Sequence, residues 1–442
     1  MAIIPQANLF SWQEIEDLGD LERLRLVLWH LPDEALMQVL ERERGRGRDD
    51  YPVRAVWNSV LAGIVFQHPS IESLRRELLR NAQLRQLCGF DVLHGAKAVP
   101  PSWVYTRFLR RLLCHDDELQ AMFDRLVEEV AEHLPDFGQV AALDGKIVTA
   151  HARGRRRNDG EHVKPDGRRD LDADWTKKVY RGRREDGTLW EKVTSFFGYR
   201  LHLFVDANYE LPIGFSVTPA SHSEVKEAHR LADRMQERIP SVLKRCEYLL
   251  ADRGFDDGAF IRKIWDELGI RPVIDIRNMW RDGEESKLVS GKRNVVYTYD
   301  GQVRCHCPLT DTVYDMAYAG FEKDRQSLKY RCPALHYGLT CKGMGECSVK
   351  TAIRIRLSED RRVFTPLARS SHRFAELYKK RTAVERVNSR LDQSFGFENH
   401  YIRGLAKMRL RCTLALSVML AMALGRIREK EGQHFRSLVQ AA

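Results

Sequence analysis

Three acidic residues lie where a chain of alternating strands and helices would build a functional site. Asp144 interrupts an apolar, strand-like run, Asp252 follows a second such run, and Glu385 lies on the polar side of an expected helix. Sites in α/β proteins form where strands end. Each acid taken singly also has a structural interpretation: an aspartate after a strand commonly caps a helix or turn, and Glu385 can pair with Arg381 four residues earlier.

Taken together, the three carboxylates indicate phosphoryl transfer. Three acids that converge at strand ends can hold two divalent metal ions about 4 Å apart, and such a pair clamps the attacking and leaving oxygens of an in-line displacement. Magnesium prefers hard oxygen ligands such as carboxylates and substrate phosphate. We therefore expect Asp144, Asp252 and Glu385 to be the catalytic residues and the ligands of two Mg²⁺ or Mn²⁺ ions.

The basic residues indicate a polyanionic partner. The 442-residue chain has a net charge of +10, and its 43% hydrophobic content excludes a disordered or collagen-like protein. Residues 361–411 alone contain 13 basic and 4 acidic side chains. Because Lys and Arg at this density bind phosphates, we expect a nucleic acid as the partner, although a solvated basic face would explain the charge too. A second basic stretch, residues 153–184, is rich in Gly and interrupted by acids, and we expect it to be a long flexible loop.

The cysteines are unevenly spread. Five of the nine lie between residues 305 and 347. In a reducing cytosol such clustering favours zinc over disulfides, although the spacing is not a paired C-x2-C pattern and a set of small buried residues would explain it too. The residues expected to hold a structural Zn²⁺ are Cys305, Cys307, Cys332, Cys341 and Cys347.

A membrane partner is not expected. The longest apolar run, Thr413–Leu424, is about half of the roughly 20 residues needed to span a bilayer, so it predicts a buried core helix. The amino terminus is acidic and has no basic segment followed by an apolar one. We therefore expect a cytoplasmic protein.

The pattern of the chain changes three times. Residues 1–135 read as helices, 136–280 as a hairpin followed by alternating strands and helices, 281–360 as short β segments around the cysteines, and 361–442 as helices again. A hairpin followed by such alternation argues for an α/β domain on a mixed sheet flanked by helices. The expected organisation is thus an all-helical amino-terminal domain and an α/β core that is interrupted by a small Cys-rich insertion.

The amino-terminal domain ends with a basic helix. A proline pair precedes Ser102, a candidate helix cap, and Arg107, Arg110 and Arg111 follow on the exposed side. Short helices with a final basic helix are compatible with a helix-turn-helix-like DNA reader. A helical bundle with arginines that extend to solvent explains them equally well, and both interpretations stay open.

Several motifs, in order, resemble bacterial insertion-sequence transposases of the DDE type. LDGK places the first acid at Asp144, the stretch from Gly198 to Ala228 resembles the hairpin-and-helix segment of that family, and LLADRGFDD places the second acid at Asp252. The resemblance covers about residues 50–425.

The most specific motif lies on the helix expected from Phe374 to Leu391. Tyr378, Arg381 and Glu385 match the spacing Y-x2-R-x3-E-x6-K, whereas Asp392 stands where the motif has its final Lys. The resemblance implies that the three acids hold the metals and that Tyr378 and Arg381 position the scissile DNA.

The resemblance also implies an activity. An RNase H-like catalytic core would bind double-stranded DNA at the terminal inverted repeats of its element, hydrolyse the 3′ strand ends with metal-activated water and join the 3′-OH groups to target DNA. Synapsis of two ends implies a homodimer, and the family implies a bacterial protein that associates with the nucleoid when bound to DNA. The residues expected to contact DNA are Tyr378, Lys379, Lys380, Arg381, Arg386, Arg390, Arg107, Arg110 and Arg111.

Two other functions remain compatible with the sequence. One is a DNA-binding protein without catalysis, such as an inactivated or domesticated copy, which the Asp392 departure leaves open. The other is a metal-dependent nuclease of the same fold that does not transfer strands.

Overall fold

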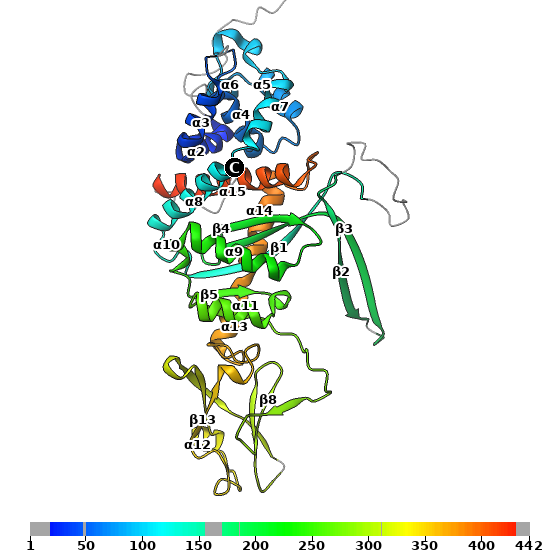
Figure 1. The fold of residues 1–442 in the computed structure, drawn as a ribbon, viewed down its shortest axis with the longest axis vertical. Helices are drawn as coiled ribbons and strands as arrows, with labels where there is room; N and C mark the ends of the chain where they lie inside the picture. The colour runs from blue at the N-terminus through cyan, green and yellow to red at the C-terminus, as the bar shows by residue number, and fades with distance from the viewer. Residues whose placement is uncertain (1–17, 47–49, 155–169, 185, 311, 430–442) are drawn as a thin grey trace, which may run out of the picture.

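The computed structural model describes residues 18–46, 50–154, 170–184, 186–310 and 312–429. Three parts follow one another along the long axis of the molecule: the amino-terminal helices, the α/β core and a small β-rich part (Figure 1). This arrangement confirms the expected α/β class with an all-helical amino-terminal region and a Cys-rich β insertion. Residues 155–169 of the expected flexible loop lie outside the described residues.

The amino-terminal part is a bundle of short helices. Ser70 caps α5 (Ile71–Arg80), because its side chain accepts a hydrogen bond from the backbone N–H of Ser73 at 3.2 Å. Ser102 does not cap: it already has helical geometry, and Pro101 holds the cap position in an extended conformation. The elements are η1 (Gly19–Leu21), α2 (Glu22–His30), α3 (Glu34–Arg44), α4 (Val53–Val65), α5 (Ile71–Arg80), α6 (Ala82–Cys88), η2 (Val92–Ala98), α7 (Ser102–Leu112) and α8 (Asp116–His133).

The core is a six-stranded mixed sheet. Its central strand β1 pairs in parallel with β5 on one side and antiparallel with β3 on the other. β5 continues in parallel to β6, and β3 pairs antiparallel with both β4 and β2. The strands are β1 (Val140–Thr149), β2 (Asp174–Arg183), β3 (Leu189–Asp206), β4 (Pro212–Pro219), β5 (Tyr248–Ala251) and β6 (Arg271–Ile274).

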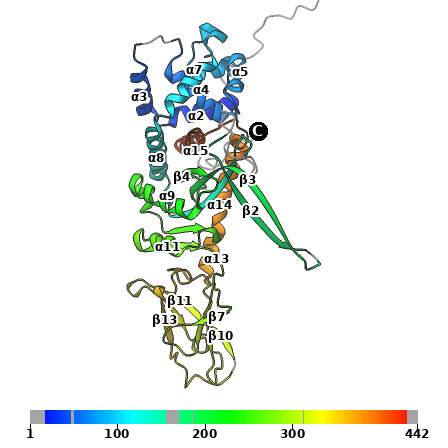
Figure 2. The same cartoon turned by 45° about the vertical axis from the view of Figure 1, so that its right-hand side comes forward.

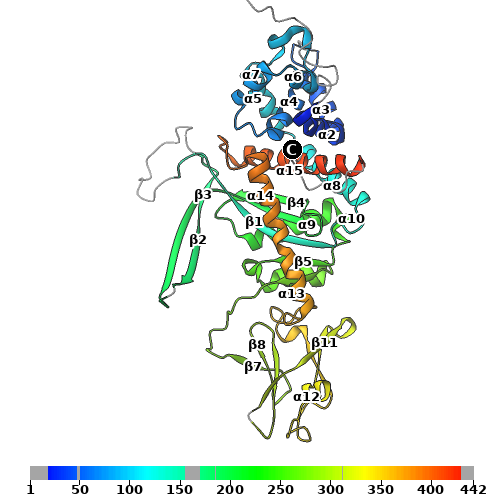
Figure 3. The same cartoon turned by 180° about the vertical axis from the view of Figure 1, so that it is seen from behind.

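Helices cover both faces of this sheet. α9 and α11 lie on one face and α13 and α14 cross the other, as the front and back views show (Figures 1 and 3). The helical elements of the core are α9 (Glu224–Arg238), α10 (Pro240–Leu243), η3 (Arg253–Phe255), α11 (Gly258–Arg262), the π turn η4 (Lys263–Glu267), α13 (His372–Lys379), η7 (Lys380–Thr382), α14 (Ala383–Phe395) and α15 (Leu405–Arg428).

The single helix expected from Phe374 to Leu391 is instead divided into α13 and α14. The hydroxyl of Thr382 donates to the carbonyl of Lys379 at 3.1 Å. Such a side-chain bond competes with the regular helical ladder, and a 3-10 turn, η7, takes its place.

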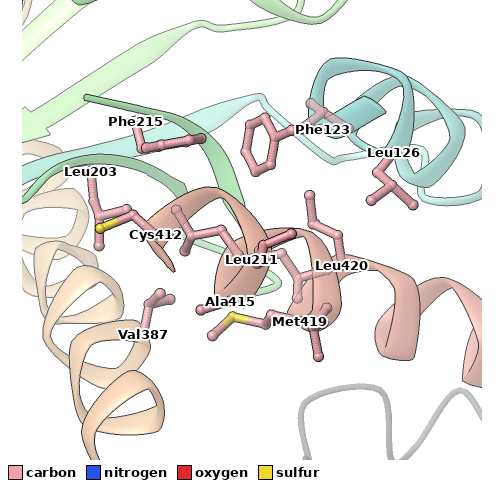
Figure 4. Packing of buried hydrophobic residues seen from close by; sticks show 14 of the residues in the cluster. Phe123, Leu126, Leu203, Leu211, Phe215, Val387, Cys412, Ala415, Met419 and Leu420 are labelled. Carbon is pink, nitrogen blue, oxygen red and sulfur yellow. The ribbon is translucent and has the colours of Figure 1, made fainter. Parts of the chain in front are cut away.

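α15 joins the sheet to the amino-terminal helices. By length and composition it could cross a membrane, but 94% of its most apolar window is buried inside the protein. Leu420 and Met419 of this helix pack in the same cluster as Phe123 of α8 and Phe215 of β4 (Figure 4). The apolar run at residues 413–424 is thus a core helix, as expected.

The β-rich part between residues 281 and 360 has its own small core. β7–β10 form one antiparallel sheet and β11–β13 form another, and Val295, Tyr330 and Ile353 are among the residues buried between them. The elements are β7 (Ser286–Leu288), β8 (Val295–Thr298), β9 (Val303–His306), β10 (Val313–Asp315), β11 (Ala317–Glu322), η5 (Lys323–Arg325), β12 (Ser327–Arg331), α12 (Pro333–Tyr337), β13 (Ala352–Arg356) and η6 (Leu357–Glu359).

Part of the expected flexible loop is a β arm. β2 pairs with the first half of β3, from Asp174 opposite Gly198 to Arg183 opposite Leu189, and the resulting ribbon projects away from the core (Figure 2). The loop prediction was therefore wrong for residues 174–183. These residues form a strand because residues 189–198 pair with them through backbone hydrogen bonds. The composition of the basic stretch does not reveal that partner.

Candidate active site

Two of the expected acids meet at one edge of the sheet. Leu143 of β1 lies opposite Ala251 of the parallel strand β5, so the next residues, Asp144 and Asp252, follow at neighbouring positions. Asp144 Oδ1 accepts a hydrogen bond from the N–H of Gly145 at 2.8 Å, and Asp252 Oδ1 accepts one from that of Gly254 at 2.7 Å. Local backbone donors therefore hold both carboxylates, that of Asp144 within β1 where its pairing with β5 ends and that of Asp252 directly after β5.

The surroundings of Asp144 disfavour its charge. Burial, followed by the nearby carboxylates of Asp252 and Glu224, raises the pKa of Asp144 from 3.8 to about 6. Arg381 acts in the opposite direction and lowers that pKa. The site is thus a partly desolvated cluster of like charges, of the kind that a bound cation would stabilise.

Glu385 stands in the first turn of α14, with half of its side chain exposed. Its Oε1 accepts a hydrogen bond from Arg381 Nη2 at 2.8 Å. Because Arg381 also acts electrostatically on Asp144, its guanidinium connects Glu385 to the first aspartate. The carboxylate of Glu385 is itself engaged with Arg381.

Glu224 is a fourth acid that the sequence analysis missed. It is the first residue of α9, and burial and the charge of Asp252 raise its pKa. Its Oε1 lies 2.9 Å from Arg200 Nη1, and a Cβ added at Gly145 would come within 2.5 Å of that same oxygen. The glycine after Asp144 thus gives Glu224 the space to approach.

One signal could have identified Glu224. Because β3 is antiparallel to both β1 and β4, β4 runs parallel to β1, and a helix that begins after β4 starts at the edge where Asp144 and Asp252 lie. An acid in the first turn of that helix is therefore placed by the same rule as the other two.

The donor set suits a divalent cation. The carboxylates are hard oxygen ligands, and the charges of Asp252 and Glu224 add to burial in raising the pKa of Asp144. Within the described part of the chain, however, no three His, Cys, Asp or Glu side chains stand in an arrangement that could hold a metal ion. Metal binding would require Glu385 to turn from Arg381 toward the aspartates.

Tyr378 and Arg381 lie beside these acids. The Tyr378 ring stacks on Phe374 with centroids 6.1 Å apart, and the Arg381 guanidinium lies 5.9 Å from the centre of the Tyr378 ring. Burial, followed by the charge of Asp275, raises the pKa of the Tyr378 hydroxyl, which is therefore a neutral hydrogen-bond donor at pH 7. The helix motif thus places an aromatic donor and a cation next to the carboxylates.

The structure partners much of the positive charge between residues 361 and 411. Lys379 pairs with Glu376 at 2.7 Å and Lys380 donates to the side chain of Asn208 at 2.8 Å. Five other cations, Arg386 and Arg390 among them, pair with acids from outside the segment. These pairs are Arg361–Asp266, Arg362–Asp256, Arg386–Glu210, Arg390–Glu210 and Arg409–Asp116. The DNA contacts expected of Arg386 and Arg390 stay predictions.

The basic helix α7 lies far along the chain from these acids. Arg107 and Arg110 are exposed, and Arg107 lies over the Trp103 ring at 5.7 Å from its centre, whereas Arg111 pairs with Glu43 at 3.5 Å. Arg110 also lines a cavity of about 630 Å³ between the amino-terminal helices and α15. The DNA contacts of these arginines stay predictions.

Asp392 has a partner within the core. It accepts a hydrogen bond from Lys146 Nζ at 2.6 Å, and the Lys146 side chain is only 10% exposed. Lys146 is the lysine of the LDGK segment, so an ion pair between β1 and α14 occupies the position where the family motif has Lys.

The five clustered cysteines come together. All of them line one small cavity between β9, the start of α12 and the loop at residues 338–350, and all are free thiols. The Cys307 Sγ accepts from the Gly343 N–H at 3.3 Å and the Cys347 Sγ from the Val349 N–H at 3.4 Å. Hydrogen bonds, first from the Thr310 hydroxyl, lower the pKa of Cys307 to about 6.

Comparison with known proteins places the chain in a family. Residues 135–421 match the family described as the transposase DDE domain, so the chain belongs to that family. No curated protein matches it. One solved structure that it resembles is the cryo-EM structure of the piggyBac transposase synaptic complex with hairpin DNA, at 12% identity, with 96% of this chain and 86% of that chain covered and a TM-score of 0.27. A structural similarity with so low a TM-score does not support an assignment. The family assignment rests on the match over residues 135–421.

Proposed function

We propose that this transposase cleaves the terminal inverted repeats of a bacterial insertion sequence and joins the 3′ ends to target DNA in the cytoplasm. The observation that carries the proposal is the placement of Asp144 and Asp252 at neighbouring positions of the parallel strands β1 and β5, with Glu385 connected to Asp144 through Arg381. A carboxylate cluster of this kind supports two-metal phosphoryl transfer.

The residues take distinct roles in this proposal. Asp144, Asp252 and Glu385 would hold two Mg²⁺ or Mn²⁺ ions, which when bound supply a nucleophile from water or a 3′-OH and neutralise the charge of the phosphate. The Arg381 guanidinium, once separated from Glu385, is free to bind the scissile phosphate. Tyr378 donates a hydrogen bond from its neutral hydroxyl to the DNA backbone beside it.

The test uses the full chain with duplexes that carry the DNA bordering its gene. Glu385→Ala is expected to keep DNA binding and to lose Mg²⁺- or Mn²⁺-dependent cleavage of those duplexes. The control is Glu376→Ala, because Glu376 is an exposed acid of the preceding helix whose ion-pair partners among the described residues are its neighbours Lys379 and His372. Persistent cleavage by Glu385→Ala would show that the assignment of the triad is wrong.

A second readout separates a transposase from the other functions. Transfer of a pre-cut 3′ end into plasmid DNA is expected of a transposase and not of a nuclease of the same fold. Binding without any cleavage would instead support an inactive DNA-binding protein. A homodimer is expected only in the complex that holds two DNA ends together, and sedimentation with and without duplex measures it.

We also propose that the five clustered cysteines hold a structural zinc ion. A Zn²⁺ ion would draw four of these thiols together and connect β9 to the loop at residues 338–350, which has no strand or helix of its own. The backbone N–H groups aimed at Cys307 and Cys347 are the kind of donors that stabilise bound thiolates. Elemental analysis should find about one zinc per chain, kept in the control Cys114→Ser and lost in Cys305→Ser. Zinc-free protein with all nine thiols titratable would contradict the site.

A further inference from the structure

The β2–β3 ribbon is an arm that projects from the core (Figures 1 and 2). Residues 177–180 and 189–193 of its two strands are exposed on both faces. The ten residues of β2 rise about 3.4 Å each, so the ribbon is about 30 Å long. An isolated two-stranded ribbon is only marginally stable in water, which suggests that this arm has a binding partner.

The arm exposes an unusual share of apolar side chains. Six of the twenty large hydrophobic residues that the described chain leaves exposed lie on it, including Leu189 at 83%. Exposed apolar groups gathered in this way mark a binding surface. The six residues are Trp175, Val179, Tyr180, Leu189, Trp190 and Val193.

Both faces of the arm carry cations and aromatic rings. Because side chains alternate along a strand, Lys178 and Tyr180 share one face with Trp190 and Lys192. The residues on the other face include Trp175, Lys177, Arg183 and the two valines. Trp190 also lies directly across Gly182, where an added Cβ would come within 2.5 Å of the indole Nε1. The first face, termed the lysine–aromatic face, therefore combines two cations with two rings.

The lysine–aromatic face begins beside the candidate active site. Thr176 lies on this face, and its hydroxyl accepts a hydrogen bond from Arg200 Nη2 at 3.1 Å. The same Arg200 pairs with Glu224, and Lys178 acts electrostatically on that carboxylate. A polymer bound along this face would therefore reach the acids.

The charge on this face favours DNA over a second protein copy. Lys178 and Lys192 make no ion pair with any residue that the structure describes, whereas the cations around α14 are mostly paired with carboxylates. Unpaired lysines bind phosphates with release of counterions, and a two-stranded ribbon fits the major groove of a duplex, which is about 12 Å wide.

We propose that the lysine–aromatic face of the arm, with Lys178, Tyr180, Trp190 and Lys192, binds duplex DNA next to the carboxylate site. The two lysines contact phosphates, and the two rings pack against the sugars and base edges of the groove. This inference rests on the proposed function, and it adds the surface that holds the DNA outside the catalytic residues.

The test measures binding of the full chain to a fluorescein-labelled duplex of random sequence, in EDTA, over a range of salt concentrations. The variant Lys178→Ala/Lys192→Ala is expected to bind at least about tenfold more weakly and to lose about 1.8 from the slope of log affinity against log salt, since each phosphate contact contributes about 0.9. The matched control Lys177→Ala, one residue away on the opposite face, is expected to bind like the unaltered chain.

A second variant tests the rings. Tyr180→Ala/Trp190→Ala is expected to weaken binding severalfold with the salt slope unchanged, because the rings carry no charge. Equal effects of Lys177→Ala and the double lysine variant, or no effect of either double variant, would overturn the proposal. Loss of self-association by the ring variant in sedimentation, with DNA affinity unchanged, would show that the arm binds a second copy instead. If the unaltered chain itself bound no duplex, the proposed function would fail, and not the arm alone.

Discussion

Replacing Asp144 with Asn should stabilise the metal-free protein while abolishing cleavage. The fold must bury a carboxylate near Asp252 and Glu224, which raises the pKa of Asp144 from 3.8 to about 6. Since the folded state holds the proton more tightly than the unfolded state, ionisation of Asp144 costs stability. The cost builds up as pH rises from about 4 to 6, and the difference in pKa corresponds to about 3 kcal/mol above pH 6.

The assay is urea unfolding followed by circular dichroism in EDTA. At pH 7.5 Asp144→Asn should raise the free energy of unfolding by up to about 3 kcal/mol, and at pH 5 the gain should fall to roughly half, because the unaltered folded protein is then protonated. Asn keeps an oxygen for the N–H of Gly145. No gain at pH 7.5, or an equal gain at both pH values, would refute the reasoning.

Asp206→Asn is the matched control. The pKa of Asp206 is also raised to about 6 by burial, but its carboxylate accepts hydrogen bonds from the backbone N–H groups of Gly138 and Asn208 on its two different oxygens. Asn would turn a donor toward one of these N–H groups, which costs about 1–3 kcal/mol and offsets most of the gain from removing the buried charge. Two acids with the same pKa should therefore differ in their response, with a clear gain in stability for Asp144→Asn and little or none for Asp206→Asn.

Three further predictions concern the surroundings of the site. Glu224→Gln should raise the Mg²⁺ concentration for half-maximal cleavage by about 10- to 100-fold with DNA affinity unchanged, and an unaltered requirement would remove Glu224 from the site. Gly145→Ala should lower the cleavage rate, because its Cβ would displace the Glu224 carboxylate, and full activity would show that this contact is unimportant. Asp392→Lys, which restores the family residue, should lower the free energy of unfolding by about 1–3 kcal/mol by leaving Lys146 against a like charge. Adding Lys146→Asp should recover part of that loss in a double-mutant cycle, and strict additivity would contradict the pairing.

Local patterns in the sequence determined the positions of the main elements and of three acids. Alternation and apolar runs predict β1, β5 and α15, and two strand ends point to Asp144 and Asp252. These predictions hold because periodicity and capping depend on neighbours in the chain. The helix motif likewise pointed to Tyr378, Arg381 and Glu385, which lie next to one another even though the helix is interrupted at η7.

Tertiary structure alone decided which charges from remote segments meet. Nothing local in the sequence pairs Lys146 with Asp392 or Glu210 with Arg386 and Arg390, because residues from remote segments form these contacts only after the sheet and helices pack. The same holds for Glu224, which reaches the site because β4 runs parallel to β1. Much of the basic excess that the sequence assigns to residues 361–411 is thus paired in the fold, whereas Lys178 and Lys192 of the β2–β3 arm make no ion pair with a described residue. The number of basic residues in a segment is set by the local sequence. Whether these residues can bind DNA depends on which acids from remote segments pack against them.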